Sequence, residues 1–402
     1  MTDNQPASWR DRLRHLATEV RDELARTGHA LGVGENRPHA IVAYRGYGHG
    51  RRALVHGRVL ESEDIAPATA ADGTWQNLLN TFRRFDSEPL AHARVAVTIA
   101  GTTRDVVADD EGFFRQWVDL PAPLSTAEPW HPVELRLVGP LIPDQPEVRA
   151  TGQLRVIGGD TELGVISDLD DTVVQSRITN FLQAVRTMML GNARTRLPFP
   201  GVAAFYQALE RGSDSRRRNP IFYVSSSPWN IYDLIADFME VQGIPAGPIH
   251  LRDWDITLSA LSSSRHREFK EPIIREILEL YPALPFILIG DNSQHDPEIY
   301  STVLKQYPGR IRAIYIRNVD ANPERSAALQ ALAQEVRAAG STLVLADDTY
   351  AAASHAAEQG WITRDSLPAI RKEKRADEGT TGAKADAPGV PDEPKAPTIV
   401  VK

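Results

Sequence analysis

The strongest constraint on the fold is an alternation of apolar runs and helical segments that fills residues 158–320. Each apolar run has the length of a buried strand, and helical segments such as 201–211 and 271–281 lie between the runs. The predicted strands cover 163–167, 221–225, 249–251, 285–290 and 311–316. Such alternation is typical of a parallel sheet with helices packed on both of its faces. We therefore predict an α/β domain here, extended by a helix, a strand and another helix within 326–362.

Residues 40–157 show a different pattern, in which short runs alternate between apolar and polar positions. Residues 91–99 and 133–138 follow the period of two expected for strands, and glycine and proline clusters separate such runs. Short strands with turn signals favour a small β-sandwich or barrel. The run Gly46-Tyr47-Gly48-His49-Gly50 has the glycines of a phosphate-binding loop. It leads into another predicted strand, whereas such a loop needs a following helix, so we interpret these as turn glycines.

The two ends of the chain differ from both central regions. Residues 8–27 predict a basic amphipathic helix, which either packs on the body of the protein or lies on a membrane surface. Residues 369–402 carry few apolar side chains and are predicted to form a disordered tail. The predicted organisation is therefore an N-terminal helix with a linker (1–39), a β-rich domain (40–157), an α/β domain (158–368) and the tail.

Composition excludes several classes of function. The net charge of the 402-residue chain is -8, which argues against a nucleic-acid partner, and any approach to an anionic membrane needs a local basic or apolar patch. The chain has no cysteine, so disulfides, thiolate metal sites and cysteine nucleophiles are excluded. The sequence shows neither a signal-peptide core nor an apolar run long enough to span a bilayer. We expect a cytoplasmic protein with no transmembrane segment, whose protein partners the sequence leaves unknown.

Acidic and polar side chains follow the predicted strands, at the edge where parallel sheets bind ligands. They are Asp168, Asp170 and Thr172 after the first strand, Ser225 and Ser226 after the second, and Asp291, Asn292 and Asp296 after the fourth, with Lys270 just before the 271–281 helix. Carboxylates gathered on one edge repel one another unless a cation lies among them, and oxygen ligands select Mg²⁺. A carboxylate can attack phosphorus, a second carboxyl can protonate the leaving oxygen, and an ammonium and a hydroxyl can hold phosphoryl oxygens. The set therefore predicts Mg²⁺-dependent phosphoryl transfer.

The order and spacing of these residues resemble the haloacid dehalogenase superfamily, whose D-x-D-x-T motif is matched by Asp168-Leu169-Asp170-Asp171-Thr172. The resemblance implies that Asp168 is the nucleophile, that Asp170 is the general acid and base, and that Thr172 orients Asp170. It implies a haloacid-dehalogenase-like fold for the α/β domain.

The later motifs of the superfamily imply roles for the remaining residues. Ser225, with Ser226 as the alternative register, and Lys270 would hold the phosphoryl group. Mg²⁺ would be bound by Asp168, Asp291, Asp296 and the backbone carbonyl of Asp170. Ser226 and Asn292 are candidate substrate contacts.

A second run in the chain serves as a comparison for the first motif. Asp347-Asp348-Thr349 also follows an apolar strand and precedes a helix, but Leu345 stands where the motif needs its first aspartate. We predict that this run is a simple helix cap.

A narrower resemblance covers more of the chain. From about 40 to 318 the chain resembles the actin-patch-associated phosphatidate phosphatase family, in the runs Ser225-Ser226-Ser227-Pro228-Trp229-Asn230, Ile289-Gly290-Asp291 through Asp296-Pro297-Glu298-Ile299-Tyr300, and Tyr44-Arg45-Gly46-Tyr47-Gly48. This implies Mg²⁺-dependent conversion of phosphatidate to diacylglycerol and phosphate, hence a phospholipid substrate and peripheral contact with a membrane.

The spacing of the motifs leaves little room for a cap domain over the site. The largest insertion, about 178–197, fits one helix and a loop, which is either packed on the core or a flap beside the site. A site with a minimal cap or none suits a large substrate, so a phosphoprotein or another large phosphoester stays open beside the lipid. A third hypothesis is a non-catalytic scaffold that binds partners through the β-rich domain. The clustered carboxylates argue against it, because they repel one another without a cation.

Overall fold

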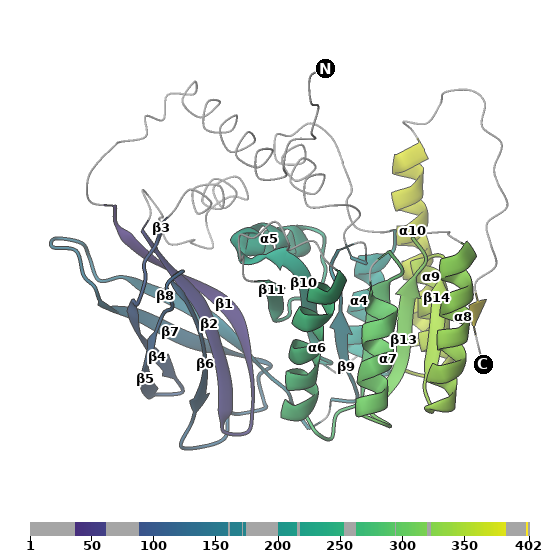
Figure 1. Ribbon diagram of the computed structural model, residues 1–402, viewed down its shortest axis with the longest axis horizontal. Helices are drawn as coiled ribbons and strands as arrows, with labels where there is room; N and C mark the ends of the chain where they lie inside the picture. Colours follow the sequence, from purple (N-terminus) through teal and green to yellow (C-terminus); the bar gives the residue numbers. More distant parts are fainter. Residues whose placement is uncertain are drawn as a thin grey trace.

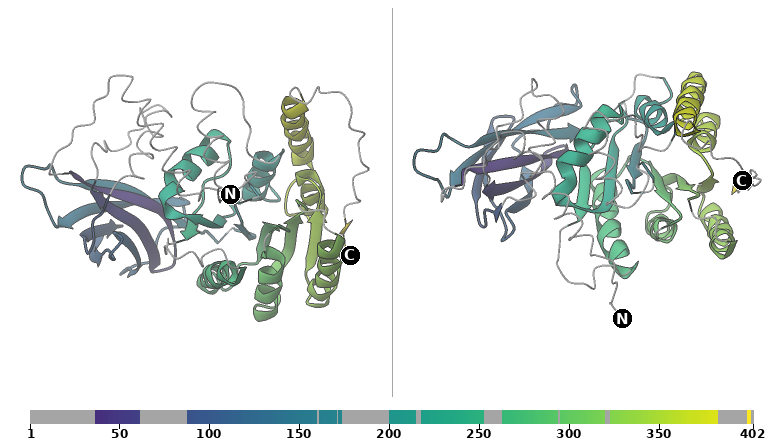
Figure 2. Two further views of the ribbon diagram at one scale, coloured as in Figure 1. Left: turned by 45° about the horizontal axis from the view of Figure 1, so that its top comes forward. Right: turned by 90° about the horizontal axis from the view of Figure 1, so that it is seen from above.

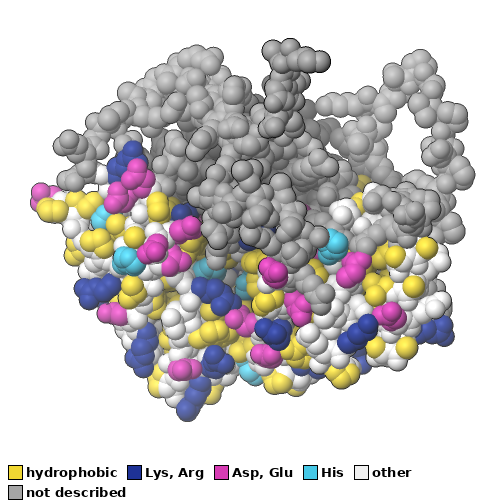
Figure 3. Space-filling model, in the orientation of Figure 1, with side chains coloured by type: hydrophobic (Ala, Val, Ile, Leu, Met, Phe, Trp, Pro, Cys, Tyr) yellow, Lys and Arg dark blue, Asp and Glu magenta, His cyan; other side chains and the backbone are white. Residues whose placement is uncertain are grey.

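The computed structural model describes residues 37–61, 88–159, 161–170, 172–173, 200–214, 218–252, 263–293, 295–319, 323–382 and 399–400. Within these residues a β-rich domain lies beside an α/β domain (Figure 1). The predicted helix at 8–27 and the insertion at 178–197 lie outside the described residues. No described helix has both the length and the apolar character needed to cross a bilayer. On the face seen in Figure 3, basic and acidic side chains of the described residues are interspersed.

The β-rich domain is one hydrogen-bonded sheet. Its strands are β1 (His39–His49), β2 (Arg52–Glu61), β3 (Glu88–Pro89), β4 (Arg94–Ile99), β5 (Thr102–Val107), β6 (Phe113–Asp119), β7 (Trp130–Gly139) and β8 (Arg149–Val156). They follow the order β3-β2-β1-β8-β7-β4-β5, and β6 pairs with β2. Inward residues from β2, β4 and β7, such as Val55, Val97 and Leu135, share one core. The predicted strands are present, but a single path joins them, so the two separate sheets of a sandwich are not seen in the described part of this domain.

Two of the glycines interpreted as turn residues lie inside strand β1 instead. The pairing of β1 with β2 shifts register between Tyr44 and Tyr47, next to Gly46. A Cβ on Gly46 would lie 2.1 Å from the backbone oxygen of Leu54, so only glycine allows the strands to approach this closely. The turn itself uses Gly50, whose φ is 58°. Because β1 leads into a strand, the run is not followed by the helix that a phosphate loop needs.

The α/β domain has the predicted parallel sheet. Its strands are β9 (Gly164–Ser167), β10 (Ile221–Pro228), β11 (Ile249–Arg252), β12 (Phe286–Asp291), β13 (Ile311–Arg317) and β14 (Thr342–Ala346). They lie in the order β11-β10-β9-β12-β13-β14, and β15 (Ile399–Val400) adds antiparallel to β14. Chain order reverses direction between β9 and β12, which makes this the switch point where open sheets of this kind bind ligands.

Helices cover both faces of this sheet, as predicted (Figure 2). They are α4 (Val202–Arg211), α5 (Tyr232–Val241), α6 (Ser263–Leu280), α7 (Asp296–Gln306), α8 (Pro323–Ala338), α9 (Thr349–Glu358) and α10 (Leu367–Gly382), with the short helices η1 (Trp229–Ile231) and η3 (Arg364–Ser366). α4, α5, α9 and α10 share one core with the sheet, and α6, α7 and α8 share the other. Neighbouring residues of β9 divide between them, since Val165 faces the first core and Ile166 the second.

Two predicted boundaries differ from the structure. Helix α6 begins at Ser263, so Lys270 lies inside the helix and not before it. Pro272 favours a helix start at this point, but the helix runs through it. Helix α10 continues to Gly382, past the predicted start of the tail at 369, because Ile370 is buried against the domain.

Aromatic side chains join the two domains, and we call this set the aromatic interface: Tyr44, Tyr47, His56, Trp229 and Tyr232. Tyr44 stacks on Trp229 with ring centroids 4.7 Å apart, and His56 meets Trp229 edge-on at 4.2 Å. The Tyr47 hydroxyl donates to Glu276 Oε1 at 2.5 Å, and the backbone N–H of Arg45 donates to the Tyr232 hydroxyl at 2.9 Å. The domains therefore share buried core and hydrogen bonds.

Candidate active site

The carboxyl ends of β9 and β12 meet at the switch point and bring two predicted site residues together. Ser167 of β9 is in register with Ile289 of β12, and the backbone N–H of Asp168 donates to the Ile289 carbonyl at 2.9 Å. Asp168 therefore follows β9 at the level where Asp291 ends β12. Both carboxylates are buried, at 1% and 0% exposure. The sheet thus positions two acids side by side at its edge.

Lys270 reaches this edge from α6 and bridges two acids. Its Nζ donates to Asp168 Oδ1 at 2.8 Å and to Asp296 Oδ1 at 2.6 Å, and all three side chains are at most 1% exposed. Burial by itself acts to lower the pKa of Lys270, but the negative charges of Asp168 and Asp296 outweigh it and raise that pKa. The lysine therefore stays protonated and holds both carboxylates in place.

Three of the predicted metal ligands form one cluster. Carboxylate oxygens of Asp168, Asp291 and Asp296 lie within 4.8 Å of one another. Burial raises the pKa of Asp168 well above its usual range, and burial together with the charge of Asp296 raises the pKa of Asp291 to about 6. Asp168 Oδ2 is buried without a hydrogen-bond partner among the described residues. With all groups ionised, Lys270 offsets one of the three negative charges. This oxygen donor set suits a divalent cation such as Mg²⁺, and binding of that ion stays a prediction.

Gly290 explains how Asp296 reaches the cluster. A Cβ on Gly290 would lie 2.5 Å from Asp296 Oδ2 and 2.8 Å from Asp296 Cβ. Asp296 is the first residue of α7, and its carboxylate accepts from the backbone N–H of Asp291 at 3.4 Å. A glycine at the end of β12 therefore leaves the space into which the start of α7 inserts its carboxylate.

Asp170 is held by two serines that follow the second predicted strand. Ser225 Oγ donates to Asp170 Oδ2 at 2.6 Å, and Ser227 Oγ donates to Asp170 Oδ1 at 3.0 Å. Ser225 Oγ also accepts from the Ser227 backbone N–H at 2.9 Å. Ser225 and Ser227 share one face of β10, while Ser226 is half-buried on the opposite face. The sequence left open which of the serines 225–227 acts and gave Ser227 no role of its own, although the period of two along a strand pairs it with Ser225.

The structure gives two predicted site residues surroundings that differ from their predicted roles. Thr172 Oγ1 is buried with no hydrogen-bond partner among the described residues, so its hydroxyl does not contact Asp170, whereas the serines do. Asn292 Nδ2 donates to Asn318 Oδ1 at 2.7 Å, and Asn292 Oδ1 accepts from the Val319 backbone N–H at 2.8 Å. Asn292 therefore ties the loops after β12 and β13 together. Its contact with substrate, like that of Ser226, stays a prediction.

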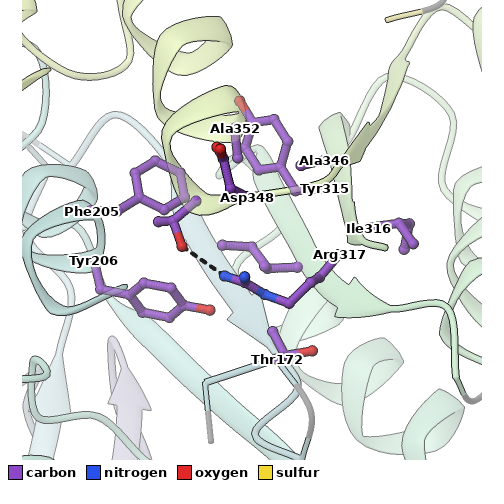
Figure 4. Close-up of a pocket in the computed structure, with 11 residues that line it drawn as sticks. Thr172, Phe205, Tyr206, Tyr315, Ile316, Arg317, Ala346, Asp348 and Ala352 are labelled. Atoms are coloured by element: carbon purple, nitrogen blue, oxygen red, sulfur yellow. Dashed lines mark hydrogen bonds between the residues drawn. The ribbon is translucent and has the colours of Figure 1, made fainter. Parts of the chain in front are cut away.

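A small pocket lies beside Thr172 at the ends of β13 and β14 (Figure 4). Arg317 crosses it and donates to Thr349 Oγ1 at 2.7 Å. Burial lowers the pKa of Arg317 to about 10, which leaves the guanidinium charged at neutral pH. Asp348 lines the same pocket and accepts from the Ala351 backbone N–H at 2.9 Å as the N-cap of α9. The prediction that the second Asp-Asp-Thr run is a helix cap is confirmed.

Comparison with known proteins connects this site to a family. Residues 163–318 match the family model described as the catalytic domain of phosphatidate phosphatase APP1. The chain is 32% identical to the phosphatidate phosphatase APP1 of Saccharomyces cerevisiae over 39% of its own length and 26% of that protein. An uncharacterized protein of Schizosaccharomyces pombe is 26% identical over 39% of this chain and 25% of that protein. The match thus spans about a quarter of the length of these curated relatives.

Among solved structures, the HAD domain of the effector protein Lem4 from Legionella pneumophila aligns with a TM-score of 0.29 and 14% identity, over 45% of this chain and 99% of that one. An alignment at this TM-score supports no conclusion about fold or function. The family match, in contrast, spans every candidate catalytic, metal and substrate residue predicted from the sequence. The resemblance is therefore confirmed for the motifs within 163–318, which match the catalytic-domain family of phosphatidate phosphatase APP1, whereas the Tyr44–Gly48 run lies outside that match.

Proposed function

We propose that this protein is a Mg²⁺-dependent phosphatidate phosphatase that works through a phosphorylated Asp168. The observation that carries the proposal is the buried Asp168–Lys270–Asp296 contact, with Asp291 beside it, at the switch point of the sheet. The family match over the same residues supports phosphatidate as the substrate class. A scaffold would have no use for buried carboxylates gathered this closely.

In the first step Asp168 attacks phosphorus, and the bond from phosphorus to the diacylglycerol oxygen breaks. Asp170 gives that oxygen its proton, so diacylglycerol leaves and Asp168 carries the phosphoryl group. The serine pair suits this role of Asp170, because hydrogen bonds to both carboxylate oxygens fix its orientation. Lys270 keeps Asp168 facing the site before the attack.

In the second step a water molecule attacks the phosphorus of the acyl-phosphate. Asp170 takes the proton of that water, phosphate leaves, and the Asp168 carboxylate is restored. When bound, Mg²⁺ would supply positive charge opposite the phosphoryl oxygens, held by Asp168, Asp291, Asp296 and the backbone carbonyl of Asp170. In this proposal the protein meets its lipid substrate as a peripheral protein on the cytoplasmic side of a membrane.

The test of mechanism is Asp168→Asn, assayed by Mg²⁺-dependent phosphate release. We expect activity to fall to background while the thermal unfolding transition stays cooperative. Asp347→Asn is the matched control, because Asp347 belongs to the look-alike run that caps α9, and we expect it to retain activity. Retained activity in Asp168→Asn would rule out the aspartyl-phosphate.

The test of substrate is a panel of phosphatidate in mixed micelles, a soluble phosphomonoester and a phosphopeptide, each with Mg²⁺. We expect preference for phosphatidate. Preference for the phosphopeptide or the soluble ester would leave the proposed phosphatase mechanism in place but refute phosphatidate as the substrate. No phosphate release from any of them would favour the scaffold hypothesis.

A further inference from the structure

A groove beside α10 combines three basic side chains with an apolar floor. It is lined by Tyr350, Leu367, Pro368, Arg371, Lys372 and Arg375 and has a volume of about 310 Å³. We call it the α10 groove. The Arg371 guanidinium lies 4.8 Å from the centroid of the Tyr350 ring, which holds this charge over the aromatic surface. The proposed chemistry of the catalytic cluster uses none of these residues.

Between Arg371 and Arg375, helix α10 separates its charges between two sides. Arg371, Lys372 and Arg375 are exposed at the groove. Glu373 turns inward, where its carboxylate accepts from the Ala204 backbone N–H at 3.1 Å, and Lys374 Nζ donates to Asp348 Oδ2 at 2.5 Å. The lining of the groove therefore carries three positive charges and no carboxylate, in a chain whose net charge is -8.

The α10 groove lies on the same edge of the sheet as the candidate active site. Asp348, which pairs with Lys374, also lines the pocket that contains Thr172. A Cβ on Gly201, at the start of α4, would lie 3.1 Å from the Ile370 carbonyl. Helix α10 therefore packs against the start of α4, the first described helix after Asp168. Figure 1 shows α10 rising beyond this edge. Its 16 residues correspond to a length of about 24 Å, enough to extend past the ends of the strands.

We propose that the α10 groove docks the protein on an anionic lipid surface. Cationic side chains beside an aromatic ring and aliphatic residues suit the boundary of a bilayer, where the charges meet lipid phosphates and the apolar floor meets the upper acyl region. Docking by this helix would turn the carboxyl edge of the sheet, with Asp168, toward the membrane. This inference rests on the proposed function in one respect: if the substrate is a membrane lipid, docking makes the active site face it.

The test measures binding of the full-length protein to vesicles by sedimentation, without turnover. The probe is a vesicle of phosphatidylcholine with phosphatidylserine, compared with phosphatidylcholine alone, so that no phosphatidate enters the active site. Each basic residue near an anionic surface contributes roughly fivefold to partitioning, so the triple variant Arg371→Ala, Lys372→Ala, Arg375→Ala should bind about a hundredfold more weakly. Added salt should also weaken the binding of the parent protein to the anionic vesicles, because it screens the charges.

The control variant removes three exposed arginines elsewhere: Arg104→Ala, Arg312→Ala, Arg337→Ala. This control changes the net charge by the same amount as the α10 variant, and we expect it to bind anionic vesicles as the parent does. Equal loss in both triple variants, or no loss in the α10 variant, would overturn the proposal. The proposal would also be overturned if the parent protein does not bind anionic vesicles but binds a poly-glutamate peptide, since that result assigns the groove to an acidic protein segment.

A soluble phosphomonoester separates this test from that of the proposed function. Its hydrolysis should be unchanged in the α10 variant, because the groove residues do not touch the catalytic cluster. Loss of hydrolysis in step with loss of vesicle binding would contradict docking as a separate role. Vesicle binding in a protein that releases no phosphate would instead refute the proposed function and leave docking supported.

Discussion

Replacement of Lys270 by methionine tests the electrostatics of the buried cluster. Methionine keeps most of the side-chain volume, so the change removes the charge and leaves little cavity. Asp168 and Asp296 then lose the ammonium that contacts them at 2.8 Å and 2.6 Å. Removal of one partner from a fully buried ion pair costs about 3–5 kcal/mol, a large share of the ~5–15 kcal/mol by which a domain is stable.

The assay is urea unfolding of the parent and Lys270→Met, each with EDTA and with Mg²⁺. In EDTA we expect the free energy of unfolding to fall by about 3–5 kcal/mol. Mg²⁺ should stabilise the variant more than the parent, because the cation then offsets charge that the lysine no longer offsets. Adding Asp296→Asn to the variant should recover part of the loss, since one buried charge is removed with its partner.

Lys305→Met is the matched control. Lys305 contacts Glu335 at 2.8 Å, the same distance as one of the Lys270 contacts, but both side chains are more than half exposed. An exposed pair of this kind contributes about 0–1 kcal/mol. If Lys270→Met lowers stability no more than Lys305→Met, the cluster is not held by buried charge and the reasoning fails.

Other predictions concern the strand end, a buried histidine and the aromatic interface. Gly290→Ala places a Cβ 2.5 Å from Asp296 Oδ2, and we expect phosphate release to fall roughly a hundredfold, while Gly159→Ala, with nothing within 4 Å, leaves it unchanged. Burial lowers the pKa of His250 from 6.5 to about 3, so the unfolded chain takes up the proton first. The contribution of His250 to stability should therefore fall as pH drops below 6.5, approaching about 1.4 kcal/mol per pH unit. The decrease in urea midpoint from pH 7 to pH 5 should be smaller in His250→Asn than in the parent. Trp229→Ala should cost about 3–5 kcal/mol in the same assay, and a loss below 1 kcal/mol would mean that the interface does not hold the domains.

The sheet of the α/β domain and most of the site were predictable because both depend on local pattern. Each strand is a short apolar run, and its last residues fall at the carboxyl edge whatever the rest of the chain does. Asp168 and Asp291 could therefore be placed together from sequence. Lys270 was placed just before a helix at 271–281, whereas α6 begins at Ser263 and includes it. The alternation along β10 that brings Ser227 to Asp170 was readable but was not used.

Contacts between distant segments could not be predicted in the same way. Arg45 and Tyr232 are 187 residues apart and form a hydrogen bond that no period in the sequence indicates. The contact of the serines with Asp170 depends on the register between β10 and β9. The apolar runs in the sequence locate the strands but do not fix that register. The inward turn of Glu373 likewise depends on how α10 packs against α4.

The aromatic interface also decides what counts as a separable module. The family match begins at residue 163, but Trp229 sits just after the serines of β10 and packs against Tyr44 and His56 of the other domain. A fragment cut at the start of the match would expose that indole next to the residues that orient Asp170. The unit to transplant, truncate or recombine is therefore the pair of domains, since a fragment that carries the catalytic motifs needs the strands that bring Tyr44 and His56 to Trp229.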